Sequence, residues 1–218
     1  MDEIDEKIEE QPEPWWKGPI TYILAVLLIL MLVVWYFPSQ AVKIDPEPAY
    51  IPAIGEVMPK NLSPDTAAVY SRRDYLKLIK PNNPAIKQTA DKIVAKACNS
   101  NKLCHAKAIY YFIQRNFNYV SDPAEFEYVK SAEESLLTQA GDCDDAAVLA
   151  SNLLQAVGIR TRFIFIPGHV YIQAYLPEAP KRYKTENNNY VSMDLTCNNC
   201  AFGELPFNSY TASKQVIG

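Results

Sequence analysis

The chain has 218 residues, of which 49% are hydrophobic, and its formal net charge is -4. This length is sufficient for one well-buried core and short for two domains. Protein faces that bind nucleic acid are strongly basic, whereas this chain is mildly acidic and has no long Lys/Arg run. We therefore expect one main folded domain and no nucleic-acid partner.

An uncharged apolar segment, ITYILAVLLILMLVVWYF, lies near the N-terminus and is long enough to cross a lipid bilayer as a helix. Aromatic residues, which favour the membrane interfaces, stand on both sides: Trp15, Trp16, Trp35 and Tyr36. The alternatives are a buried core helix and a cleaved signal peptide, but an acidic tail precedes the segment and no small-x-small cleavage site closes it. We predict an acidic tail over residues 1–18 and a transmembrane helix over 19–37.

Lysines on the two sides of this helix suggest an orientation. Lys7 and Lys17 precede it and Lys43 follows, which favours a cytoplasmic tail and an extracytoplasmic C-terminal domain. Six prolines between residues 38 and 64 are typical of a semi-rigid, extended spacer. The predicted organisation is thus tail, membrane helix, Pro-rich linker over 38–64, and one domain over 65–218.

Helical patterns fill the first half of this domain, over residues 65–79, 84–97 and 105–117. A longer amphipathic helix follows Gly141 and ends at Gly158, which occupies a capping position. The pattern then changes to that of strands, over residues 161–166, 169–176 and 190–195. Helices first and strands afterwards predict an α+β domain in which helices pack on an antiparallel sheet.

Cys143 lies at the first turn of the long helix, in GDCDDAAVLASNLLQAVGIRTRF. Unpaired backbone N–H groups and the helix dipole favour a thiolate there, and the same groups could stabilise an oxyanion. The helical stripe that Cys143 shares with three alanines should point Sγ toward the sheet. Asp142, Asp144 and Asp145 would raise the pKa of the thiol, so an imidazole partner is required. The alternative is an inert, buried cysteine.

His169 and Asp194 lie on the same face of two strands that can pair as a hairpin. A register that sets Val170 opposite Met193 and Ile172 opposite Val191 brings apolar residues together, and it places His169 directly opposite Asp194. Slips of two residues would keep the same faces. The pattern therefore predicts a base and its orienting carboxylate, with a structural histidine and a turn-forming aspartate as the alternative.

The segments GDCDDAAVLASNLLQAVGIRTRF, GHVYIQAYL and YVSMDLT together resemble the Cys, His and Asp motifs of the transglutaminase-like superfamily, whose fold is papain-like. The resemblance covers about residues 106–196 and suggests a membrane-anchored microbial member. It implies a triad of Cys143, His169 and Asp194 that transfers acyl groups of a protein or peptide substrate through a thioester, without a metal or a cofactor. Gln139 and Tyr119 are candidates for a second oxyanion donor.

Four further cysteines remain: Cys98, Cys104, Cys197 and Cys200. An even number in an extracytoplasmic domain favours two disulfides, with three connectivities open. The C-x5-C and C-x2-C spacings could instead hold a structural zinc ion in a cytoplasmic domain. A redox role for the C-x2-C pair is less favoured, because no helix pattern follows it.

These patterns together predict a membrane-anchored cysteine enzyme that hydrolyses or transamidates amides. One alternative is a catalytically inactive binding domain on the same scaffold at the membrane surface. Another is a zinc-containing interaction domain in which Cys143 is inert.

Overall fold

The computed structural model describes residues 14, 18–41, 45–60, 62–64, 69–123, 128–184 and 188–218. The chain divides into two compact units, Met1–Lys43 and Ile44–Gly218. The following paragraphs treat each unit by itself.

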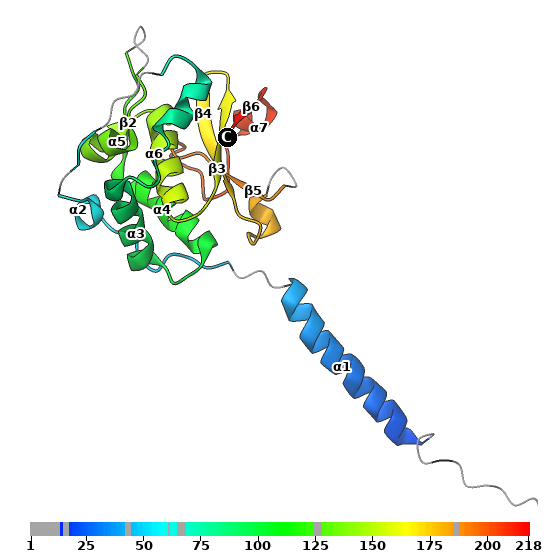
Figure 1. Ribbon diagram of the computed structural model, residues 1–218. Coiled ribbons are helices and arrows are strands. Elements are labelled where there is room, and N and C mark those ends of the chain that lie inside the picture. The colour runs from blue at the N-terminus through cyan, green and yellow to red at the C-terminus, as the bar shows by residue number, and fades with distance from the viewer. Residues whose placement is uncertain are drawn as a thin grey trace, which may run out of the picture. The chain divides into compact units, whose positions relative to one another are not determined.

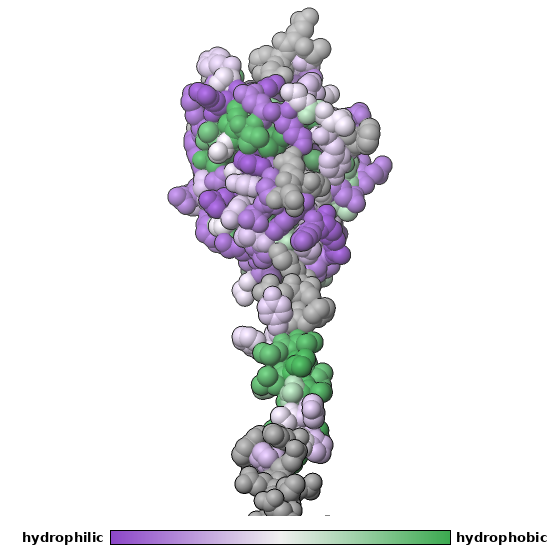
Figure 2. Space-filling model, turned by 90° about the vertical axis from the view of Figure 1, so that its right-hand side faces the viewer, coloured by the Kyte–Doolittle hydropathy of each residue, from purple (hydrophilic) through white to green (hydrophobic). Residues whose placement is uncertain are grey.

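The first unit contains helix α1, Pro19–Ala41. The stretch Pro19–Tyr36 is long and apolar enough to cross a membrane, and none of it is buried. Figure 2 shows this helix as a band of hydrophobic surface. Such a helix is compatible with a single-pass membrane anchor or with a signal sequence. Trp15 and Trp16, expected at one interface, lie outside the described residues.

The second unit is built on a four-stranded antiparallel sheet of β3 (Thr161–Ile166), β4 (His169–Tyr175), β5 (Tyr190–Met193) and β6 (Gln215–Ile217). The strand order is β5-β4-β3-β6. The first three strands match the predicted segments closely. Strand β6 was not predicted, because three residues are too few to show a period. A small two-stranded parallel ladder joins β1 (Asn118–Tyr119) to β2 (Ala140–Gly141).

Helix α6, Cys143–Ala156, lies at the centre of the core and packs on β3 and β4. Beyond Cys143, Gln155 is its only residue that is not buried. Three helices, α3 (Pro84–Ala97), α4 (Lys102–Asn116) and α5 (Ala132–Thr138), pack against α6 (Figure 1). The mixed helical and antiparallel architecture confirms the predicted α+β class, with the predicted helices 84–97 and 105–117 found as α3 and α4.

The expected helix over residues 65–79 differs from the structure. Residues 65–68 lie outside the described part, and the segment Arg72–Leu78 is a 3-10 helix, η2. Short elements complete the unit: α2 (Ile54–Val57), η3 (Lys181–Tyr183) and α7 (Phe207–Thr211). Helix α5 was not predicted from the sequence, although Ser131 caps it by accepting a hydrogen bond from the Glu134 N–H.

Part of the Pro-rich stretch predicted as a spacer packs on the domain. Val57 is fully buried, and the Ala49 N–H donates to the Ala97 carbonyl over 2.9 Å. Proline excludes helix but leaves an extended chain free to lie along a surface. Because residues 45–57 pack on the domain, less of the Pro-rich stretch is left to act as a spacer. The predicted boundaries of the tail, the membrane helix, the linker and the domain stay a proposal.

A buried lysine holds the beginning of this segment. Lys107 of α4 is fully buried, and its Nζ lies 2.7 Å from Asp45 Oδ1 and also pairs with Glu47. The ring centroids of Tyr183 and Phe202 lie 5.1 and 5.9 Å from the same Nζ. Carboxylates and aromatic faces together compensate for the loss of water around the ammonium group.

We predict that Lys107→Ala lowers the free energy of unfolding by about 3 kcal/mol, because it removes a buried stem and the ammonium group that pairs with Asp45 and Glu47. Within the described part of the chain, Asp45 would keep only its contacts with Arg182 and Tyr183. The measurement is urea unfolding followed by circular dichroism. The matched control is Lys96→Ala, whose exposed pair with Glu56 at 3.2 Å should contribute less than about 1 kcal/mol. Equal losses for the two variants would contradict this account of Lys107.

Candidate active site

The start of α6 is fixed by reciprocal capping. Asp142 is the N-cap residue, and its Oδ1 accepts from the N–H groups of Asp144 at 3.0 Å and Asp145 at 3.4 Å. The Asp142 N–H in turn donates to Asp145 Oδ2 over 3.3 Å. This is the capping-box arrangement, in which carboxylates at both positions satisfy helix N–H groups. It places Cys143 at the first helical position, as predicted.

Asp145 also ties the helix to a neighbouring segment. It is fully buried, and its two oxygens accept from the Lys130 N–H at 2.7 Å and from Lys130 Nζ at 2.6 Å. Burial raises the pKa of Asp145, while Lys130 acts in the opposite direction. Gly141 is required beside it, because a Cβ at this position would overlap the Asp145 carboxylate. Lys130 and Gly141 were missed as positioning residues in the sequence, where nothing marks their contact with Asp145.

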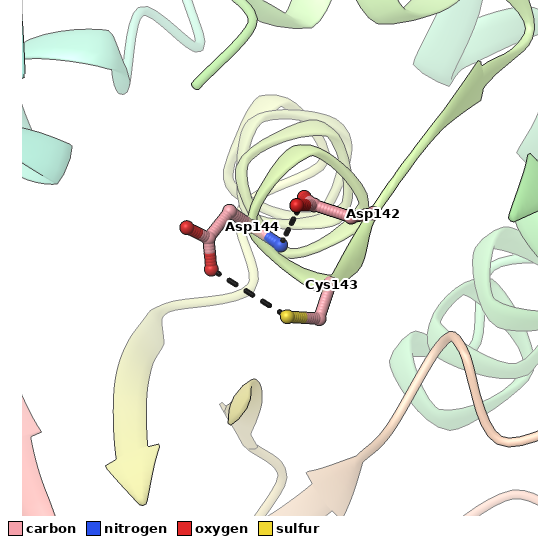
Figure 3. Close-up of side chains that lie close together, drawn as sticks. All are labelled: Asp142, Cys143 and Asp144. Carbon is pink, nitrogen blue, oxygen red and sulfur yellow. Dashed lines mark hydrogen bonds between the residues drawn. The ribbon is translucent and has the colours of Figure 1, made fainter. Parts of the chain in front are cut away.

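The Cys143 thiol is free and lies against a carboxylate. Its Sγ donates to Asp144 Oδ1 over 3.6 Å (Figure 3), and the Val170 N–H donates to the sulfur. Burial raises the pKa of Cys143 to about 12, assisted by the charge of Asp144 and opposed by the Val170 N–H. The neighbouring aspartates thus raise the pKa of the thiol, as predicted, and burial raises it more than they do. Asp144 itself is held by a hydrogen bond from Tyr75, a residue that sequence reasoning missed.

The structure brings His169 and Asp194 together. His169 Nε2 lies 2.8 Å from Asp194 Oδ2, and the Asp194 side chain is only 2% exposed. The other carboxylate oxygen accepts from the Thr196 N–H at 3.2 Å and from Thr196 Oγ1 at 3.1 Å. Because a carboxylate only accepts, Nε2 carries a proton in this contact. Thr196 was not singled out in the sequence, although an Asp-x-Thr pattern is typical of such local bonds.

The predicted register of this hairpin is wrong by two residues. Ile172 lies opposite Met193, where the prediction placed Val191, and pairing ends there. His169 and Asp194 are therefore diagonal neighbours beyond the last ladder pair. They still share one face, since a slip of two residues preserves the alternation, and a diagonal separation of roughly 7–8 Å is within reach of long side chains.

A two-residue turn sets the position of His169. Pro167 and Gly168 connect β3 to β4, and His169 pairs with Ile166 as the first residue of its strand. Gly168 has φ of +70°, a left-handed conformation that favours glycine. His169 is thus the first residue of β4, a strand on which α6 packs.

Cys143 and His169 line the same cavity, which has a volume of about 570 Å³. Tyr119, one of the candidate oxyanion donors, also lines it. Gln139, the other candidate, has φ of +53° and caps the end of α5. His105 lies on α4, where its Nε2 contacts the Asn99 carbonyl at 2.9 Å, and it is not among the residues that line this cavity.

The other four cysteines form two disulfides, Cys98–Cys104 and Cys197–Cys200. This confirms the predicted disulfides and selects one of the three connectivities. Their sulfurs are consequently engaged in bonds to each other, which contradicts the alternative of a zinc ion held by these cysteines. In the described part of the chain, one group could hold a cation: the ligand atoms of Asp142, Cys143 and Asp144 lie within 4.8 Å of one another. Backbone N–H groups already occupy Asp142 Oδ1.

The profile of the transglutaminase-like superfamily matches residues 87–195, half of the chain. The chain belongs to this superfamily. The matched segment begins in α3 and ends one residue after Asp194, so it contains all three predicted site residues. No curated protein sequence matches the chain.

Several solved structures are similar to this superfamily member. They include a candidate protease from Parabacteroides distasonis ATCC 8503 (16% identity, TM-score 0.42, 55% of this chain and 28% of that one). A candidate cysteine protease from Cytophaga hutchinsonii has 19% identity and a TM-score of 0.40, over 68% and 53% of the two chains. Legionella pneumophila LapG has 21% identity and a TM-score of 0.38, over 60% and 75%. The chain thus spans about a quarter and a half of the first two proteins.

We predict that Asp144→Asn increases the rate at which iodoacetamide alkylates Cys143 at pH 8. The substitution removes a negative charge and an acceptor beside the thiol, so the pKa of Cys143 falls and the thiolate fraction rises. A decrease of one pKa unit corresponds to about a tenfold rate increase. In the wild type the rate should keep rising through alkaline pH, because the pKa is raised to about 12.

The control is Asp91→Asn, an exposed aspartate on α3 whose charge pairs with Lys87. It should leave the alkylation rate unchanged. A slower reaction in Asp144→Asn than in the wild type would show that Asp144 assists the thiol instead of holding it protonated.

Proposed function

We propose that this chain is a membrane-anchored cysteine acyl-transfer enzyme that hydrolyses or transamidates amides of proteins or peptides. Cys143 is the nucleophile, His169 the base and Asp194 the residue that orients the base. The observation that carries the proposal is the 2.8 Å contact of His169 Nε2 with Asp194, made at the cavity that holds the free thiol. A nucleophile, a base and an orienting carboxylate are the minimum set for this chemistry.

The position of the proton on His169 determines which nitrogen can act as the base. With Nε2 donating to Asp194, the acceptor nitrogen of His169 is Nδ1, which takes the proton of the Cys143 thiol. Burial and Asp144 keep the thiol protonated at rest, so the proton leaves as the sulfur attacks the substrate carbonyl. The Cys143 N–H at the start of α6 is the proposed donor to the resulting oxyanion.

Attack on the carbonyl gives a tetrahedral intermediate that carries this oxyanion, and its collapse breaks the amide bond. The departing nitrogen takes the proton from His169 Nδ1, and the acyl group remains on Sγ as a thioester. Water or a primary amine then loses a proton to Nδ1 and attacks the thioester. Attack by water gives hydrolysis, and attack by the amine gives transamidation. In both, the thiol recovers its proton from His169.

The second candidate function is a catalytically inactive binding domain on the same scaffold. The raised pKa of Cys143 favours it, since a protonated thiol is a poor nucleophile. The His169–Asp194 contact favours the enzyme, because a binding domain has no need for an oriented imidazole at the cavity that holds a free thiol. Turnover by the triad variants distinguishes the two.

We predict that Cys143→Ala abolishes turnover of a casein-like or glutamine-peptide substrate, since no other free thiol is present in the described part of the chain. His169→Ala should be nearly as damaging, whereas Asp194→Ala should keep part of the activity, because nucleophile and base survive. Ammonia release, amine incorporation and peptide cleavage are measured at matched folding.

His105→Ala is the control for loss of a histidine and should retain the wild-type rate. Turnover that persists in Cys143→Ala, or that disappears in His105→Ala, would show that the catalytic residues lie elsewhere.

We also propose that the C-terminal domain lies outside the cytoplasm. Two disulfides are typical of proteins in an oxidising compartment, and α1 can serve as the anchor. We predict that protease added to intact cells degrades the C-terminal domain and spares the acidic tail, as followed with antibodies against each part. Protection of the domain until the membrane is broken would reverse this topology.

A further inference from the structure

A second cavity adjoins the one that holds Cys143. It has a volume of about 490 Å³, and Tyr119 lines both cavities. Tyr119 is 56% exposed, so part of this aromatic residue is open to a ligand. The two cavities are therefore neighbours.

One wall of the second cavity is connected through the backbone to Cys143. Phe117 and Tyr119 lie at the end of α4 and in β1, and Tyr119 pairs with Gly141 of β2. The Val120 N–H extends this ladder by donating to the Gly141 carbonyl over 2.8 Å. Gly141 precedes Cys143 by two residues, so this wall keeps a fixed position relative to the nucleophile.

A second wall is connected to Asp194. Leu195, Thr196 and Asn198 line the cavity, and Thr196 donates twice to the Asp194 carboxylate. Gln114 of α4 holds this wall, because its Nε2 donates to the Cys197 carbonyl over 3.2 Å. Both walls are thus built from segments that also position the proposed triad.

The lining of this cavity combines apolar and aromatic side chains with polar ones. Ile51, Tyr111, Phe117 and Leu195 supply side-chain carbon, and Arg115 is the only charged residue among those that line it. The guanidinium of Arg115 donates to the Ile51 carbonyl over 3.1 Å. A cavity of this composition favours a bulky uncharged side chain, which would bury its surface against the rings.

We propose that this cavity is a specificity subsite that takes a large apolar or aromatic side chain of the substrate, a few residues from the amide attacked by Cys143. The inference rests on the proposed function, because it identifies the substrate class of the same site. The occupant is an extended polypeptide, since Tyr119 lines both the subsite and the cavity of the thiol, and one chain that runs past this residue would reach both.

Asn198 and Asn199 provide a matched pair of positions for the test. Both are exposed in the loop closed by the Cys197–Cys200 disulfide, but only Asn198 lines the cavity. Asn198→Trp places a bulky ring in the mouth of the subsite, whereas Asn199→Trp adds the same ring outside it.

The experiment uses the full chain in detergent and a library of peptides derived from digested cell protein, with cleavage and amine incorporation mapped by mass spectrometry. The wild type should prefer Phe, Tyr, Trp or Leu over Ala at one fixed position by about tenfold or more. Asn198→Trp should lower kcat/KM for a Phe peptide by about tenfold and leave the Ala counterpart within about twofold. Asn199→Trp should leave both peptides within about twofold.

The outcomes separate the inference from the function on which it rests. Products that Cys143→Ala also forms, or no products at all, would overturn the proposed function. Products that depend on Cys143 but show no preference for a bulky apolar residue would overturn the subsite alone. A preference for acidic residues, or equal effects of the two Trp variants, would also overturn the subsite alone.

Discussion

The buried Asp145 carboxylate is the constraint on which the geometry of the site depends. It accepts from Lys130 through both the backbone and the side chain, and it completes the reciprocal cap with Asp142. An unpaired buried carboxylate would be costly, so the segment before α6 has little freedom to move away. Cys143 is held at the first position of a helix that the sheet and three other helices enclose.

The same cap produces an electrostatic conflict at the Cys143 thiol. Asp144 lies beside the thiol, and together with burial it raises the pKa of Cys143, whereas the helix start and the Val170 N–H favour the anion. The balance keeps the proton on sulfur at rest. A proposed base that is oriented by a buried carboxylate resolves the conflict, because proton transfer to His169 can accompany attack on the substrate.

Local patterns in the sequence predicted much of this arrangement. The Gly141–Gly158 helix, the strands and the shared face of His169 and Asp194 follow from periodicities of 3.6 and 2. The register could not be predicted, because slips of two residues keep every side chain on its face. The contacts of Tyr75, Lys130 and Gly141 with the aspartates of α6 also lay beyond prediction, since they join segments whose proximity only the folded chain establishes.

The most direct test of the central claim is to map which cysteine a thiol-directed electrophile modifies in the folded, non-reduced protein, and how fast. The account predicts modification at Cys143 alone, with the sulfurs of both disulfides unreactive, and a slower reaction when His169 is replaced by alanine. Modification at another cysteine, or a rate at Cys143 that does not depend on His169, would contradict the assignment of nucleophile and base.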